Sequence, residues 1–346
     1  MKLGLFQGYS GSQFSIDIQT ILEAEKLGFQ SAWTSEAYGS DAFTPAAWIL
    51  AQTKKIKVGT GIVQMPARTP ACTAMTALTL QALSQDRFIL GIGPSGPQVI
   101  EGWHGVPYGK PITRTKEYIS IIKQIIERKA PVKHDGYHYQ IPYNGEGASG
   151  LGIPLKSILH ASSTIKIFTA AVTPIGIRTA AEVSDGMFPI FMSPERFDVF
   201  ANDLEIGFKK STNDKGLSTF HIAPIVPVSM GDDIILCRKP IKRFLALYIG
   251  GMGAPGKNFY TDYAKRLGYE EAAIKIQRLY LTGNQKEAES EVPDELVDSI
   301  ALVGSPSHIK ERLVAWKEIS KENKVSSLLL SGASLEALRL IASEVL

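Results

Sequence analysis

Cysteine is scarce in this chain, with only Cys72 and Cys237 among 346 residues. Two cysteines cannot form a disulfide framework, and no CxxC pair or Cys/His spacing fits a structural zinc site. We therefore expect no metal. Long apolar runs are missing too, because no stretch approaches the ~18–20 apolar residues that a membrane-spanning helix needs. Residues 1–9 are too short an apolar run for a secretion signal. The expected location is the reducing cytoplasm, without a membrane partner.

A surplus of one charge is also absent. Lys and Arg number 37 against 34 Asp and Glu, which leaves a net charge of only +3. The longest basic cluster, residues 238–243, is local and typical of a solvated helix face. Nucleic-acid binding proteins usually carry a basic stripe, so we expect no nucleic-acid partner. The 44% hydrophobic content is enough for a large core and excludes disorder as the main state.

Short apolar runs alternate with longer amphipathic ones along the whole chain. Helices are expected at 16–27, after Pro45, at 70–83, 112–127, 174–183, from Pro194, at 306–319 and at 335–346. Strands are expected at 3–7, 31–34, 56–63, 88–91, 165–170, 187–191, 220–229 and 326–330. Eight strands, each followed by helical sequence, predict an α/β fold of the (β/α)8 TIM-barrel class. We expect one domain, residues 1–346, with insertions at about 130–163 and 235–293, the first holding a hairpin at 134–139.

The expected strand ends are rich in glycine and small polar residues, as suits a ligand close to the backbone. Residues 91–96 match GxGxxG, but a dinucleotide site needs a helix at once, and Gly102 and Gly105 argue against one. Thr173 and Pro174 open the helix after the fifth strand, where an anion would be attracted. An ordinary capped helix is the alternative there.

Three titratable residues near strand ends are candidates for proton transfer: Glu36, Glu101 and His104. A plain salt bridge is the alternative for each acid, and a surface position for the histidine. Glu36 ends the second strand, and burial there would favour its protonated form and let it act as a proton donor. A hydrolytic triad is neither indicated nor excluded.

Several segments together resemble the bacterial luciferase-like superfamily, and within it the branch of coenzyme F420-dependent oxidoreductases. The segments are SEAY (35–38), VGTGIV (58–63), RTP (68–70), FILGIG (88–93), SGPQVIEGW (95–103), YIGGMG (248–253) and LVGSP (302–306). The resemblance implies a barrel that binds F420, a deazaflavin, or alternatively FMN, at the carboxyl ends of the strands. It also implies a non-prolyl cis peptide between Gly61 and Ile62, a ring-edge contact from Gln64, and a phosphate at 171–177.

The positions expected to contact the cofactor are Glu36, Thr60, Gly61, Ile62, Val63, Gln64, Ser95, Gly96, Gln98, Ala171, Val172, Thr173, Ile175, Gly176, Ile177, Gly250 and Gly251. Two departures stand out. The acid ending strand two in deazaflavin members is usually Asp but here is Glu36. Members that oxidise alcohols or sugar phosphates carry a His next, where this chain has Ala37.

The leading functional hypothesis is therefore hydride transfer between F420 and an unidentified small organic substrate. An FMN-dependent monooxygenase served by a separate flavin reductase is the alternative, and a barrel that binds flavin without turnover is a third. The family usually forms dimers through helices near the second and third barrel units. Here the helix around residues 48–50 and that at 74–83 offer apolar faces beyond one core stripe, so we expect a homodimer.

Overall fold

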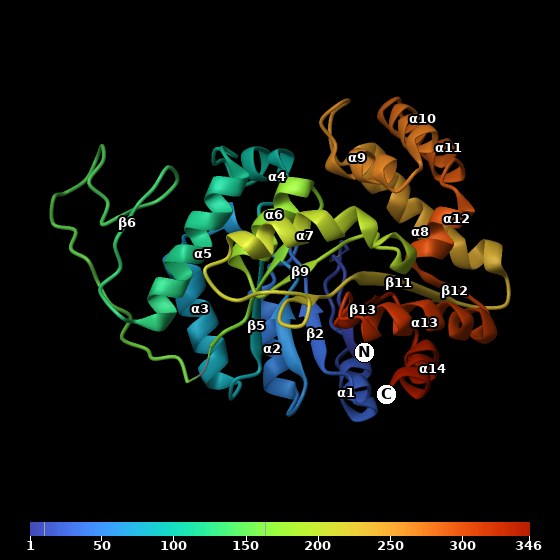
Figure 1. Cartoon of the computed structure of the whole chain (residues 1–346), viewed down its shortest axis with the longest axis horizontal. Coiled ribbons are helices and arrows are strands. Elements are labelled where there is room, and N and C mark those ends of the chain that lie inside the picture. The colour runs from blue at the N-terminus through green and yellow to red at the C-terminus, as the bar shows by residue number, and fades with distance from the viewer. Residues whose placement is uncertain (10, 163) are drawn as a thin grey trace.

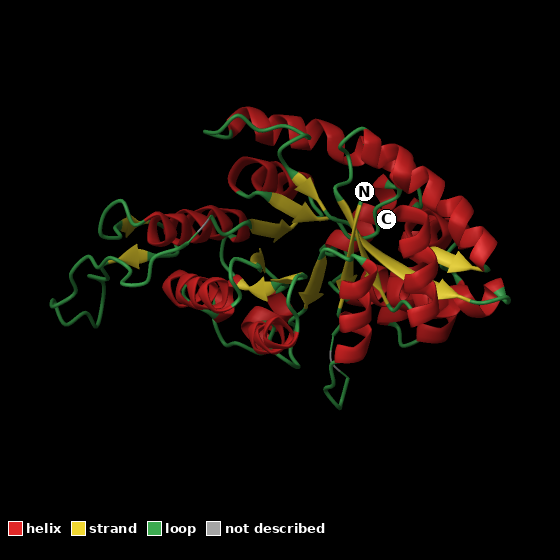
Figure 2. Cartoon of the chain, turned by 90° about the horizontal axis from the view of Figure 1, so that it is seen from below, coloured by secondary structure: helices red, strands yellow, loops and turns green. Residues whose placement is uncertain are grey.

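The computed structural model describes residues 1–9, 11–162 and 164–346. A parallel sheet curls into a barrel, and helices surround it (Figures 1 and 2). The strands run in the order β10-β9-β8-β5-β3-β2-β1-β13-β11-β12. Their bounds are β1 (Lys2–Phe6), β2 (Ser31–Thr34), β3 (Lys57–Thr60), β5 (Phe88–Gly93), β8 (Ile167–Ala170), β9 (Gly186–Phe188), β10 (His221–Ile222), β11 (Ile225–Met230), β12 (Leu302–Gly304) and β13 (Ser327–Ser331). The predicted (β/α)8 barrel is confirmed.

One stretch of chain joins the two ends of the sheet. β10 pairs with β9, and β11 pairs with β13, both in parallel. Only Ala223 and Pro224 separate the two segments. A further parallel bridge joins Ile190 to Ile225. The segment predicted as a single seventh strand therefore closes the barrel by pairing with a different neighbour in each half.

The barrel helices begin and end where local sequence signals favour it. Asp17 caps the first helix through the N–H of Thr20, and Gly28 ends it with a left-handed φ of 94°. Thr69 and Thr173 cap two further helices, each with proline at the first position. The helices around the barrel are α1 (Ile18–Leu27), α2 (Phe43–Gln52), α3 (Pro70–Leu83), α5 (Pro111–Glu127), α6 (Pro174–Val183), α7 (Asp198–Lys210), α13 (Pro306–Lys321) and α14 (Leu335–Val345).

Aromatic side chains fill the inside of the barrel. Trp33, Phe168 and Phe188 form the centre of a buried cluster distinct from the larger core between sheet and helices. The Trp33 indole donates to the Ser31 hydroxyl at 2.8 Å. Gly59 pairs with Trp33 across β2 and β3, and a Cβ there would lie 2.3 Å from the indole ring. Glycine at 59 therefore makes room for the tryptophan, so the interior is a packed core.

Three local predictions were wrong or incomplete. The strand predicted at 56–63 is split into β3 and β4 (Val63–Gln64), which pairs with β5. A short helix, α4 (Pro97–Gly102), does follow β5, because Gly102 only ends it and Gly105 lies beyond it. The strand β12, which pairs with the outer edge of β11, was not predicted because its three residues fall below a recognisable pattern.

The two insertions differ in structure. Residues 130–162 hold the predicted hairpin, as β6 (His134–Asp135) and β7 (Gln140–Ile141), and then project from the barrel beside α5 (Figure 1). The second insertion is helical: α8 (Ile234–Ala246), a π-helical segment at Leu247–Gly251, α9 (Phe259–Arg266), α10 (Glu270–Leu281), α11 (Gln285–Ser290) and α12 (Asp294–Ile300). No helix within the described residues combines the length and apolarity of a membrane span.

Candidate active site

Four polar residues meet where β2, β4 and β5 end, and we call them the polar wall: Glu36, Gln64, Arg68 and His104. Glu36 is buried, and its carboxylate accepts four hydrogen bonds. Two come from the Arg68 guanidinium, at 2.7 and 2.8 Å. The backbone N–H groups of Gln64 and Ala42 supply the others, at 3.0 and 3.2 Å. The acid therefore joins the end of β2 to β4 and to the residue before α2.

The pairing with Arg68 changes the chemistry expected of Glu36. Burial alone would lower the pKa of Arg68, but the hydrogen bonds and charge of Glu36 outweigh it and raise that pKa. A bidentate guanidinium and two backbone donors thus occupy the carboxylate oxygens of Glu36. Sequence reasoning kept a salt bridge open as the alternative for Glu36, which the structure shows, but it did not name Arg68, 32 positions along the chain. Both residues follow neighbouring strands, but nothing in their spacing indicates the contact.

The peptide bond between Gly61 and Ile62 is cis, as the resemblance implies. It lies between β3 and β4, and the N–H of Gly61 donates to Thr34 at 2.6 Å. Thr60 is buried, and its hydroxyl both donates to the carbonyl and accepts from the N–H of Gly91. The Thr60 side chain therefore joins two strands, while Ile62 is only half-buried.

Gln64 and His104 are joined at the polar wall. Gln64 Nε2 donates to the carbonyl of Ala37 at 3.1 Å, so its Oε1 is the acceptor facing His104. The distance from His104 Nε2 to that oxygen is 2.6 Å. His104 Nε2 must then carry a hydrogen, which leaves Nδ1 as the ring nitrogen that can take up a proton. Three predicted site residues, Glu36, Gln64 and His104, are thus brought together.

The loop after β5 holds the remaining candidates of this region. Ser95 has a positive φ of 57°, and its carbonyl accepts from the Tyr108 hydroxyl at 3.1 Å. Gly96 precedes α4, and Gln98 lies exposed on its first turn. The exposed Glu101 accepts the N–H of Tyr108 at 3.1 Å. Glu101 thus helps to fold the loop and does not join the polar wall.

The turn after β8 gains a basic residue that the sequence did not indicate. Thr173 caps α6 through the N–H of Gly176 at 3.1 Å. Arg266, from the end of α9, donates to the carbonyl of Val172 and lies over the Tyr263 ring at 5.1 Å. A guanidinium therefore sits beside the N-terminus of α6 and the predicted residues 171–177. The positive guanidinium and the positive end of the α6 dipole both favour binding of an anion at this turn.

A second set of side chains, the aromatic wall, consists of Tyr9, Phe191, Tyr248 and Tyr260. Tyr9 follows β1, Phe191 follows β9, and the two others come from the helical insertion. The Tyr248 hydroxyl donates to that of Tyr9 at 2.9 Å, and its ring lies 4.8 Å from that of Tyr260. Burial raises the pKa of Tyr248, which keeps its phenol neutral.

The predicted glycines 250 and 251 lie next to this wall, but packing explains them. A Cβ on Gly250 would lie 2.4 Å from Cβ of Tyr280, on α10, and one on Gly251 would lie 2.6 Å from the Tyr280 ring. Both positions allow α10 to pack closely on the π-helical segment. They therefore support the aromatic wall from behind.

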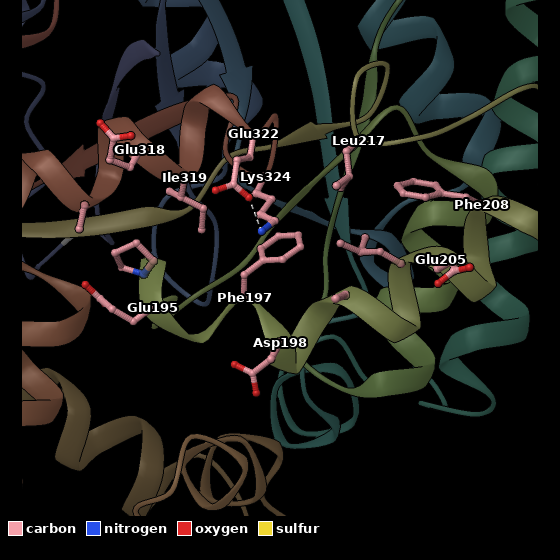
Figure 3. A pocket seen from close by; sticks show the side chains of 14 residues that line it. Glu195, Phe197, Asp198, Glu205, Phe208, Leu217, Glu318, Ile319, Glu322 and Lys324 are labelled. Carbon is pink, nitrogen blue, oxygen red and sulfur yellow. Dashed lines mark ion pairs between the residues drawn. The ribbon is translucent and has the colours of Figure 1, made fainter.

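A separate groove lies away from the polar and aromatic walls. It has a volume of about 740 Å³, lies on the outside of the barrel between α7 and α13, and is floored by Phe197, Leu204, Phe208, Leu217 and Ile319 (Figure 3). Its rim acids include Glu322, paired with Lys324 at 2.5 Å. It shares no described residue with the predicted site. Within the described ranges, no group of three His, Cys, Asp or Glu side chains is placed to hold a metal.

Comparison with known proteins places these features in context. The sequence profile of the family described as "Luciferase-like monooxygenase" matches residues 7–321. A Mycobacterium tuberculosis protein named "Putative coenzyme F420-dependent oxidoreductase Rv3520c" is 40% identical over 347 residues, which cover 100% of this chain and 99% of that protein. The matched length includes both walls and both insertions.

Two solved structures have the same fold. The coenzyme F420-dependent tetrahydromethanopterin reductase of Methanopyrus kandleri superposes with a TM-score of 0.78 at 22% identity, covering 99% of this chain and 98% of that one. The oxygenating constituent of 3,6-diketocamphane monooxygenase of Pseudomonas putida, in complex with FMN, superposes with a TM-score of 0.66 at 20% identity. The match covers 100% of this chain and 97% of that one. At these identities the likeness establishes the fold alone.

Proposed function

The chain belongs to the luciferase-like monooxygenase family, and from this premise we propose that it transfers a hydride between coenzyme F420 and a small organic substrate. The observation that carries the proposal is the 40% identity, along the entire chain, to a protein named for coenzyme F420. A likeness of that extent includes the loops that line the mouth, whereas fold likeness alone is shared by enzymes that differ in cofactor.

The residues at the turn after β8 fit the phosphate of such a cofactor. We propose that Val172, Thr173 and the first turn of α6 hold it, with Arg266 supplying the charge. The guanidinium is already placed by its bond to the Val172 carbonyl. Fixed charge and free helix N–H groups together suit a phosphate better than either alone.

The polar wall fits the edge of a planar ring. Ile62 is half-buried at the cis peptide, and Gln64 beside it is held at both ends of its amide. We propose that Glu36 and Arg68 position this strand end rather than exchange protons with the substrate, because the carboxylate and the guanidinium already bind each other. Because hydrogen bonds fix the Gln64 amide and the end of β4, both can orient a ring without reorganising during the reaction.

When bound, the reduced deazaflavin supplies a hydride. The chain's own residues then have three tasks. The polar wall would orient the cofactor ring relative to the substrate, and the aromatic wall would exclude water from both. The substrate that receives the hydride also needs a proton, and His104 donates it from Nδ1–H and is reprotonated from solvent, because Nε2 is committed to Gln64. Ala37 stands where alcohol- and sugar-phosphate-oxidising members of the family have a histidine, so substrate reduction is the proposed direction.

Cofactor identity is tested by titrating the purified protein with F420 and with FMN while following fluorescence quenching. F420 should bind at least tenfold more tightly, equivalent to ~1.4 kcal/mol. Arg266→Met should weaken the binding of F420 by about tenfold. Arg243→Met, which replaces an 81% exposed side chain, should leave the affinity unchanged. Tight FMN binding without F420 binding would instead establish the FMN-dependent monooxygenase.

We also propose a homodimer that pairs through α2 and α3. Neither helix contains a charged residue, and every other described helix of ten or more residues contains at least one. Both expose large apolar side chains: Trp48, Met75 and Leu83. In a two-fold interface each surface meets its own copy, so the absence of charge avoids self-repulsion. Met75→Lys should convert the dimer to a monomer in sedimentation, and a wild-type monomer would contradict the proposal.

A further inference from the structure

Two large aromatic side chains lie in solvent at the edge of the barrel mouth, and we call Tyr38 and Trp103 the aromatic lip. Tyr38 is 65% exposed and Trp103 is 66% exposed. The centroids of the two rings are 6.5 Å apart, with an angle of 54° between the ring planes. Exposed apolar side chains that gather beside a site, unlike isolated ones, indicate a binding surface.

The backbone joins the aromatic lip to the polar wall. Tyr38 follows Ala37, whose carbonyl accepts a hydrogen bond from Gln64 Nε2 at 3.1 Å. Trp103 precedes His104, whose Nε2 lies 2.6 Å from Gln64 Oε1. One side-chain amide therefore connects the two segments that carry the lip. The exposed rings are thus held directly beside the histidine proposed to donate a proton.

The aromatic lip also lies close to the aromatic wall. Burial raises the pKa of Tyr9 and of Tyr248, and the nearby Tyr38 phenol adds to both increases. Figure 1 shows α4, which Trp103 follows, and the helical insertion at the same end of the barrel. The lip therefore extends the apolar surface of the aromatic wall toward the polar wall. The Tyr9 and Tyr248 phenols stay neutral, so they add no charge to this surface.

Fixed positive charge is missing from both segments that carry the lip. Residues 35–42 contain Glu36 and Asp41, residues 95–108 contain Glu101, and neither range contains Lys or Arg. The Glu36 carboxylate is already balanced by its ion pair at the polar wall. A carboxylate or phosphate held on the lip would meet the like charge of the other two acids, with no lysine or arginine from either segment to balance it.

We propose that the aromatic lip binds the flat, apolar body of an uncharged carbonyl or alkene compound, which is the substrate that this site reduces. The proposal rests on the hydride transfer proposed above. Flat groups pack favourably on aromatic faces, and a molecule held on Trp103 has its reacting end beside His104. The substrate carbon takes the hydride supplied by reduced coenzyme F420, which is thereby oxidised. The carbonyl oxygen, or the neighbouring alkene carbon, takes the His104 proton, so the product is uncharged as well.

The test uses three enones that share one body: benzylideneacetone, its para-carboxylate and its para-trimethylammonium derivative. Their affinities for the full chain are measured by isothermal titration calorimetry, with and without F420. The uncharged enone should bind about tenfold more tightly than the carboxylate. A carboxylate or a cation that binds as tightly as the uncharged enone would overturn the proposal. No binding of the uncharged enone at roughly 10 mM would overturn it too.

Variants of the lip give a second readout on the same enone. Trp103→Ala should weaken its binding by about tenfold, and Trp103→Phe should restore the affinity to within about threefold of the wild type. Tyr143→Ala is the matched control, because it removes a 57% exposed ring from the loop beside α5 and should leave the affinity unchanged. In turnover, Trp103→Ala should raise KM and keep kcat within about twofold. Equal affinities for Trp103→Ala and the wild type would overturn the proposal.

Failure of this proposal is distinguishable from failure of the proposed function. If F420 binds and Trp103→Ala leaves the affinity for the uncharged enone unchanged, the hydride transfer stands and the lip is wrong. If F420 does not bind and the enone still binds in a way that depends on Trp103, the lip stands as a binding surface and the hydride transfer is wrong. Calorimetry without F420 separates the two results.

Discussion

The polar wall and the aromatic wall occupy different sides of the barrel mouth and are built in opposite ways. In the polar wall, Glu36 accepts four hydrogen bonds and Gln64 is bound at both ends of its amide. In the aromatic wall, packed rings are joined by a single hydroxyl contact between Tyr248 and Tyr9. The first wall fixes orientation, and the second supplies apolar area.

The difference suggests that the polar wall serves the reaction and the aromatic wall selects the substrate. A buried ion pair tolerates substitution poorly, because removing one partner leaves the other charge buried and unpaired. Packed rings tolerate replacement by other apolar groups of similar volume. The polar wall also comes from loops of the barrel itself, whereas half of the aromatic wall comes from the helical insertion. We therefore expect substitutions in the polar wall to affect cofactor binding, rate or stability, depending on the residue, and those in the aromatic wall to affect which substrate binds.

The largest effect should come from His104→Gln, which removes the proposed proton-handling nitrogen. With an acceptor found by screening carbonyl and alkene compounds, single-turnover oxidation of bound reduced F420 should slow by roughly 10²–10⁴-fold. Glu101→Gln is the matched control, since its carboxylate only accepts the Tyr108 N–H, and its rate should stay within about twofold. Equal rates for His104→Gln and the wild type would remove this residue from the reaction.

Arg68→Met should destabilise the fold strongly, because it leaves the buried Glu36 carboxylate without its countercharge. We expect a loss of ~3–5 kcal/mol in the free energy of unfolding. Arg339→Met breaks the more exposed pair with Glu23 and should leave the free energy of unfolding nearly unchanged. Urea denaturation of both variants checks the difference, and similar costs would mean that the polar wall is no more constrained than the surface.

Substitutions in the aromatic wall should have smaller effects on stability. Tyr248→Phe removes one hydroxyl and retains the ring packing, so we expect a loss of ~1 kcal/mol in the free energy of unfolding. Combining it with Tyr9→Phe in a double-mutant cycle isolates the contact. The two losses should be clearly less than additive, because both single changes break the same 2.9 Å bond. Strict additivity would show that the two hydroxyls do not interact.

Much of the fold follows from local signals in the sequence. α3 and α6 begin and end at the predicted residues because a threonine cap and a first-turn proline mark their starts. β12 was missed, because three residues carry no period and its pairing with β11 is a tertiary contact. The split of the third strand follows from the resemblance, since no local pattern indicates a cis peptide at Gly61 and Ile62.

The site was predicted less completely than the fold. Glu36 and His104 were expected near each other because both follow predicted strands, and strand ends meet at one mouth. Gln64 came from the resemblance to the family. Arg68 and Arg266 were missed, since their partners lie 32 and 94 positions away and ion-pair geometry leaves no trace in spacing. Gly250 and Gly251 were predicted to contact the cofactor, and the structure adds that both also lie close to Tyr280. A glycine needed for packing looks the same in sequence as one needed for a ligand.

The central claim is that the polar wall positions the cofactor through the paired Glu36 and Arg68 side chains. Glu36→Gln tests it directly, with F420 affinity and the single-turnover rate of the bound complex measured on the same preparation. The account predicts at least tenfold weaker binding with a bound-state rate within about twofold of the wild type. Unchanged affinity together with a rate lower by roughly 10²–10⁴-fold would contradict it and make Glu36 the proton donor.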